Sequence, residues 1–124
     1  MTAEETVNAF LAACERADID AAIALVADDI RYENIGMNVL EGAAATREFL
    51  GPFLGQCDEI EWVVHHQTAD DRVVMNERTD RFRVGDNWAG IHLMGVFVVE
   101  DGKITEWRDF FDVAEAGRQL AQLG

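Results

Sequence analysis

The chain of 124 residues is 49% hydrophobic, and its 24 acidic and 10 basic side chains give a formal net charge of −14. This length predicts one domain over residues 1–124, with enough apolar residues for a buried core. So negative a chain repels phosphate, which argues against nucleic acid and anionic membrane surfaces as partners.

Helical patterns dominate the first half of the chain. A capping-box pattern, followed by apolar residues at every third or fourth position, predicts a helix from residue 2 to about residue 14. A second helix is predicted to end near residues 27–29, and residues 30–34 predict a short strand. A third helix begins after Gly42. We expect Pro52 to kink or stop it, because proline lacks the backbone N–H that a helix needs.

The second half has the β-branched, aromatic and alternating pattern of strands. The tail from residue 114 predicts a last helix, broken by Gly117. Helices followed by a meander of long strands predict an α+β fold, in which a curved sheet wraps around the N-terminal helices and leaves a pocket. The four predicted strands, separated by turn signals, cover residues 59–67, 72–84, 88–100 and 103–113.

Acidic and basic residues alternate in the segment NERTDRFRV, inside the strand predicted over residues 72–84. Side chains of a strand alternate between two faces, so Arg78 and Asp80 share a face with apolar neighbours, which predicts the inner face. Asp109 lies in the same way on an aromatic face of the last strand. We therefore expect Arg78, Asp80 and Asp109 to project into one mostly apolar cavity.

An arginine between two buried carboxylates has two interpretations. It lets one acid stay protonated while its neighbour is ionised, which is the arrangement that acid–base catalysis requires. The alternative, a purely structural ion pair, is supported about equally well by the pattern. Tyr32 and Asn34 share a face of the short strand and could hold one water molecule together. Tyr32 alone also suits an ordinary core position.

Other catalytic signals are absent from the sequence. There is no serine to act as a nucleophile, and the single lysine, Lys103, lies in a turn, which does not suit a Schiff-base amine. No glycine-rich motif offers a cradle for a nucleotide cofactor. His65 and His66 are adjacent in a strand and are expected to point to opposite faces, so no metal site is predicted. Cys14 and Cys57 form no CxxC pair, and the first residues lack signal-peptide features, so we expect reduced thiols in the cytoplasm.

Three segments resemble the limonene epoxide hydrolase family in order and spacing: YEN at residues 32–34, ERTD at 77–80 and ITEWRDFFD at 104–112. The similarity covers nearly the whole chain, and the last segment is the most specific. It implies the cystatin-like cone shared with nuclear transport factor, ketosteroid isomerases and SnoaL-like polyketide cyclases. In that fold the N-terminal helices pack in the concave face of a highly curved, mixed, mostly antiparallel sheet. The resemblance also implies a homodimer without a cofactor.

The resemblance implies an epoxide hydrolase that adds water to a small apolar epoxide, limonene-oxide-like or cyclic, to give a vicinal diol. Tyr32 and Asn34 match the residues that hold the attacking water, and Asp109 matches the base that deprotonates it. Asp80 matches the acid that protonates the epoxide oxygen, and Arg78 matches the bridge between the two aspartates. The implied mechanism is one concerted step with no covalent intermediate.

The sequence departs from the family's pattern at the pocket rim, where IGMNVLEG lacks the prolines expected of the limonene enzyme and the N-terminal arm is short. Apolar residues near the predicted site are candidates for the pocket wall, although each would also serve as ordinary core. These candidates are Ile35, Met37, Phe53, Phe82, Ile91, Leu93, Trp107 and Phe111.

Two other functions are compatible with the pattern. An isomerase or cyclase of the same fold would abstract a proton from carbon with Asp109 or Asp80, and would not need the water held by Asn34. A non-catalytic module that binds an apolar ligand would need neither carboxylate. The complete set of five polar residues favours the hydrolase.

Overall fold

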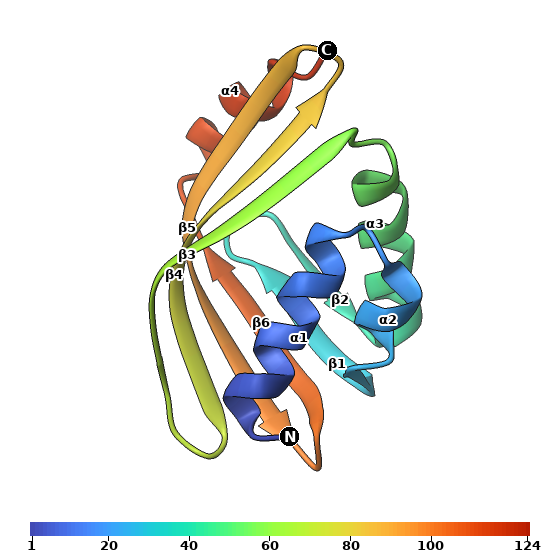
Figure 1. Ribbon diagram of the computed structural model, residues 1–124, viewed down its shortest axis with the longest axis vertical. Helices are drawn as coiled ribbons and strands as arrows, with labels where there is room; N and C mark the ends of the chain where they lie inside the picture. Colours follow the sequence, from blue (N-terminus) through green and yellow to red (C-terminus); the bar gives the residue numbers. More distant parts are fainter.

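Four helices and one six-stranded sheet make up the computed structural model, which describes residues 1–124 (Figure 1). The helices are α1 (Ala3–Glu15), α2 (Ile19–Ile23), α3 (Ala43–Gly55) and α4 (Val113–Ala121). The strands are β1 (Val26–Asn34), β2 (Asn38–Glu41), β3 (Glu59–Ala69), β4 (Val73–Val84), β5 (Asn87–Glu100) and β6 (Lys103–Phe110).

The sheet has the strand order β2-β1-β6-β5-β4-β3. Only β1 and β6 run parallel, and every other neighbouring pair is antiparallel. The sheet curves strongly, and α1, α2 and α3 lie on its concave side (Figure 1). The predicted α+β cone with a mixed, mostly antiparallel sheet is confirmed.

Helix α1 supplies the centre of the core. The predicted capping box is present, since the Thr2 hydroxyl accepts from the Glu5 backbone and the Glu5 carboxylate accepts from the Thr2 backbone. Phe10 is fully buried and packs edge-on against Trp107 of β6, with ring centroids 5.1 Å apart. Burial of such aromatic pairs holds the helix inside the cone and thereby defines the space left for a pocket.

The segment after α2 forms strand where helix was expected. Helix α2 ends at Ile23 and β1 begins at Val26, so the prediction of a helix to residues 27–29 is wrong. Val26 pairs with Ile104 of β6, and both side chains are buried. This pairing joins distant parts of the chain, so local apolar spacing could not reveal it. The short strand β2, which pairs with β1, was not predicted either.

Two helices continue through residues that were expected to interrupt them. Helix α3 extends past Pro52 to Gly55, because Leu50 and Leu54 are both buried against the core while the proline itself faces solvent. Helix α4 passes through Gly117, and its first turn is capped by the side chain of Asp112. That cap also explains why β6 ends at Phe110 and not at residue 113.

The histidines lie on the outer face of the sheet. The register of β3 shifts between Val64 and His66, and a bulge of this kind breaks the alternation of side chains. His65 consequently contacts Thr79, and His66 contacts Glu77, on the same face of β4. The prediction that the two histidines point to opposite faces is therefore wrong. None of the four helices combines the length and the hydrophobicity that a membrane span requires.

Candidate active site

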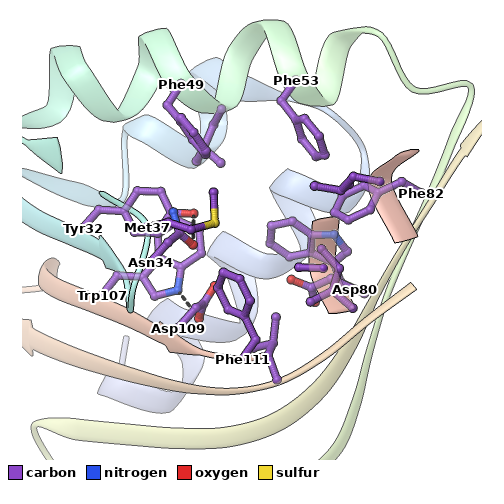
Figure 2. A pocket seen from close by; sticks show the side chains of 16 residues that line it. Tyr32, Asn34, Met37, Phe49, Phe53, Asp80, Phe82, Trp107, Asp109 and Phe111 are labelled. Atoms are coloured by element: carbon purple, nitrogen blue, oxygen red, sulfur yellow. Dashed lines mark hydrogen bonds between the residues drawn. The ribbon is translucent and has the colours of Figure 1, made fainter. Parts of the chain in front are cut away.

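A cavity of about 100 Å³ lies between the concave face of the sheet, α3 and α4 (Figure 2). Thirteen of the 16 residues that line it are hydrophobic, and the three polar ones are Asn34, Asp80 and Asp109. Figure 2 shows Phe49 and Phe53 of α3 pointing into this space from the side opposite the two aspartates. The cavity therefore presents two carboxylates and one amide to an otherwise apolar interior.

Arg78 joins the two carboxylates from behind the cavity wall. Its side chain is completely buried, and Asp80 and Asp109 are 5% and 4% exposed. The guanidinium donates from Nε to Asp80 Oδ1 at 3.1 Å and from Nη2 to Asp80 Oδ2 at 3.2 Å. The same Nη2 donates to Asp109 Oδ2 at 3.2 Å. One arginine thus forms a bridge between acids on two different strands.

The strands bring these groups together as the alternation predicted. Arg78 and Asp80 are two residues apart on the inner face of β4, and Asp109 reaches them from β6 across the intervening strand β5. Gly95 of β5 lies directly opposite Asp109. A Cβ atom at Gly95 would lie 2.4 Å from Arg78 Nη1 and 3.0 Å from Asp109 Oδ1, so only glycine leaves room for the bridge.

Tyr32 and Asn34 extend the polar group along β1. They pair in register with Trp107 and Asp109 of the parallel strand β6. The Tyr32 ring stacks on Trp107 with centroids 3.8 Å apart, and its hydroxyl donates to Asn34 Oδ1 at 3.3 Å. Asn34 in turn donates to Asn38 Oδ1 at 3.0 Å, which fixes the direction in which its amide points.

Burial dominates the electrostatics of the two acids. It raises the pKa of Asp80 to about 6, although the positive charge of Arg78 and its hydrogen bonds oppose the rise. It also raises the pKa of Asp109, against the charge of Arg78 and a hydrogen bond from the Trp107 indole N–H at 2.8 Å. Burial likewise raises the pKa of Tyr32 well above its ordinary value, so this hydroxyl stays neutral.

The structure brings together all five predicted polar residues and most of the predicted wall. Ile35 does not line the cavity, because β1 ends at Asn34 and Ile35 lies in the turn that follows it. Its backbone N–H donates to the carbonyl of Asp109 instead. The predicted wall residues that do line the cavity are Met37, Phe53, Phe82, Ile91, Leu93, Trp107 and Phe111.

Sequence reasoning missed five wall residues. Phe49 and Leu50 lie on α3, one turn before Phe53, and helical periodicity from that residue could have suggested them. The other three depend on tertiary packing, which no local pattern gives: Trp62 of β3, and Ala116 and Leu120 of α4.

The arrangement places two carboxylates of raised pKa at the wall of a mostly apolar cavity. The carboxylates of a purely structural ion pair need not face a cavity. The carboxylates of Asp80 and Asp109 both line one. A curved cone with helices inside and two buried, arginine-bridged carboxylates at its centre defines a protein of the NTF2-like fold with a candidate acid–base site.

Comparison with known proteins places the chain within this class. The family model described as the limonene-1,2-epoxide hydrolase catalytic domain matches residues 1–122, and the chain belongs to this family. Epoxide hydrolase EphG of Mycobacterium tuberculosis (strain ATCC 25618 / H37Rv) is 39% identical over 114 residues, which cover 92% of this chain and 76% of that protein.

Solved structures agree with this assignment. An LEH-like epoxide hydrolase from M. tuberculosis superposes with a TM-score of 0.83 and 37% identity, covering 96% of this chain and 90% of that one. The epoxide hydrolase/cyclase-like enzyme SalBIII has a TM-score of 0.80 at 22% identity, with 90% and 92% of the two chains covered. At that identity the likeness establishes the fold alone.

Gly95→Ala tests the close approach of β5 to the arginine. The new methyl group would displace the guanidinium and leave buried charges unpaired, so we expect the free energy of unfolding to fall by about 3–5 kcal/mol. Gly90→Ala is the matched control on the same strand, because its Cβ would lie 3.7 Å from the nearest side-chain atoms. It should change stability by less than about 1 kcal/mol. Urea unfolding measures both, and equal effects would contradict the proposed crowding.

Proposed function

We propose that this protein is a cofactor-independent epoxide hydrolase, which adds water to a small apolar epoxide and releases a vicinal diol. The observation that carries the proposal is the pair of buried carboxylates, bridged by Arg78, at the wall of an apolar cavity. Membership of the limonene-1,2-epoxide hydrolase family and the relationship to EphG support the same chemistry.

In this mechanism Asp109 is the base. Its Oδ1 accepts from the Trp107 indole, a hydrogen bond that Asp80 lacks and that favours the ionised form. Asn34 lies beside Asp109 in register, and the neutral hydroxyl of Tyr32 lies next to that amide. These three groups would hold one water molecule, whose proton passes to Asp109 while its oxygen attacks a ring carbon.

Asp80 is the acid. With a pKa raised to about 6 by burial, it retains its proton more readily than an ordinary aspartate. As the carbon–oxygen bond of the epoxide breaks, the proton of Asp80 passes to the leaving oxygen, which becomes the second hydroxyl of the diol. After each turnover Asp109 holds a proton and Asp80 lacks one. Arg78, which contacts both, stabilises whichever aspartate is charged until the proton returns.

The cavity wall favours a hydrocarbon skeleton, limonene-oxide-like or cyclic. Phe49 and Phe53 of α3 point into the cavity, and the rings of Phe53 and Phe82 pack edge-on with centroids 4.9 Å apart. Apart from the three polar groups of the site, no lining side chain offers a charge or an amide to a substrate. Binding energy in such a pocket comes mainly from buried apolar area.

Diol formation tests the proposal directly. The purified protein would be incubated with a panel of epoxides that includes limonene oxide and cyclohexene oxide, and the products would be separated by chiral chromatography. We expect diol from the wild type and at least about 100-fold less from Asp109→Asn, which removes the base. Glu106→Gln, on the same strand but outside the cavity, is the matched control and should retain activity.

Diol from Asp109→Asn at the wild-type rate would mean that Asp109 is not the base. Asn34→Ala distinguishes the hydrolase from the isomerase alternative. It should abolish hydrolysis but leave proton abstraction from carbon largely intact. A module that merely binds an apolar ligand would retain its affinity for that ligand in both Asp80→Asn and Asp109→Asn.

The pH dependence follows from the raised pKa of Asp80. The acid must be protonated, so we expect kcat/KM to fall as the pH rises through about 6. It should also fall at lower pH, where Asp109 becomes protonated, and the two apparent pKa values belong to the coupled pair. Initial rates from about pH 4 to about pH 9, corrected for uncatalysed hydrolysis, measure this profile. A kcat/KM that stays constant or increases above pH 6 would contradict the acid role of Asp80.

We further propose that the chain forms a homodimer through the outer face of its sheet. Met75, Met94 and Phe110 are 45%, 50% and 42% exposed there, and the last two are cross-strand neighbours. A second copy would cover these apolar side chains. Light scattering coupled to size-exclusion chromatography should give twice the mass of one chain, and Met94→Glu should give the monomer mass. A monomeric wild type would refute this proposal.

A cytoplasmic location remains a prediction.

A further inference from the structure

We propose that Asn76 is a positioning residue for the reaction, which sets the orientation of the Arg78 guanidinium between the two aspartates. This inference rests on the proposed hydrolase function and assigns a role to a residue that does not line the cavity. Asn76 lies on the inner face of β4, two residues before Arg78, and is 1% exposed.

The contact between the two side chains is the shortest that the guanidinium makes. Arg78 Nη1 donates to Asn76 Oδ1 at 2.8 Å, whereas the bonds from Nε and Nη2 to the aspartates are between 3.1 and 3.3 Å. Because the guanidinium is planar, an acceptor on Nη1 determines where the other two nitrogens point. With Asn76 in place, Nε faces Asp80 and Nη2 lies between Asp80 and Asp109.

A chain of amides determines which end of Asn76 faces the arginine. Gln67 donates from Nε2 to the carboxylate of Glu4 at 2.9 Å and to Asn8 Oδ1 at 3.0 Å, both on α1. An ionised carboxylate can only accept, so the Gln67 nitrogen faces α1 and its oxygen faces Asn76. Asn76 then donates to Gln67 Oε1 at 3.1 Å, which leaves its own oxygen for Arg78. The orientation is thus transmitted from α1 to the site.

Asn76 must be uncharged as well as supply an acceptor oxygen to Arg78. An aspartate here would also accept from Nη1, but it would add a third negative charge beside the pair and raise the pKa of both acids. The other ionisable groups near the pair are Cys14 of α1 and Tyr32 of β1. Burial raises the pKa of each. The two aspartates are therefore the groups that titrate between acidic and neutral pH.

Two variants of similar size separate these effects. Asn76→Leu removes the acceptor and leaves a buried N–H of Arg78 without a partner. We expect kcat to fall roughly 10- to 100-fold, with a smaller change in KM, because the wall of the cavity is unchanged. Asn76→Asp keeps the acceptor and should move the pH profile of kcat/KM upward by about one unit.

The matched control is Val74→Ala, on the same face of the same strand and also fully buried. It should lower the melting temperature through lost packing while leaving the pH profile in place. A second readout is independent of turnover: carbon-13 NMR titration of the Asp80 and Asp109 carboxyl groups in each protein. The titration should shift in both Asn76 variants and remain at the wild-type position in Val74→Ala.

An unshifted titration in Asn76→Leu would overturn the proposal and leave Asn76 a structural residue, whereas Asn76→Asp shifts the titration through its added charge in either case. The proposal also fails if Val74→Ala shifts the titration as much as Asn76→Leu does. If the wild type hydrolyses no epoxide, the proposed function fails, but the NMR titration still decides whether Asn76 orients the arginine. Should Asn76→Leu not fold, Asn76→Ala removes the same acceptor and gives the same decision, since its side chain also leaves Arg78 Nη1 without Asn76 Oδ1.

Discussion

The guanidinium of Arg78 is buried without contact with solvent and forms hydrogen bonds to Asp80 and Asp109. The neighbouring residues must accommodate this buried charge. Placing three ionisable groups in an apolar interior costs several kcal/mol per ion unless each finds partners. The structure supplies them: Asn76 for the arginine, Trp107 for Asp109, and a glycine on β5 that lets the groups meet across the strand. The cost of burying the charge of Arg78 therefore explains why these three residues are present, although none of them takes part in the proposed chemistry itself.

The fold makes this arrangement possible. A flat sheet packed against helices would bury its inner face completely, but the curved sheet keeps a space between α3, α4 and the strands. Asp80 and Asp109 lie on strands separated by β5, and only the inward curvature and the missing side chain at Gly95 bring them to one guanidinium. Because one fold can host unrelated functions, the function proposed for this chain rests on the five polar groups and not on the architecture.

Alternation along strands was the most informative feature of the sequence. It placed Arg78, Asp80 and Asp109 on inner faces before any tertiary information, because a period of two depends only on local backbone geometry. It failed where the period was broken, as at the bulge beside His66, and beyond the end of a strand, as at Ile35. The start of β1 at Val26, the helix through Pro52 and the contribution of α4 to the cavity all depend on distant partners, which local propensity does not describe.

In the proposed reaction, water attacks the epoxide directly while Asp109 and Asp80 exchange protons with the reactants. A single-turnover reaction in ¹⁸O-labelled water, with enzyme in excess over epoxide, distinguishes this reaction from one with a covalent intermediate. We expect one labelled oxygen in every diol of the first turnover and no label in the protein. An unlabelled first-turnover diol, with ¹⁸O then appearing in a carboxylate of Asp80 or Asp109, would show instead that an aspartate is the nucleophile.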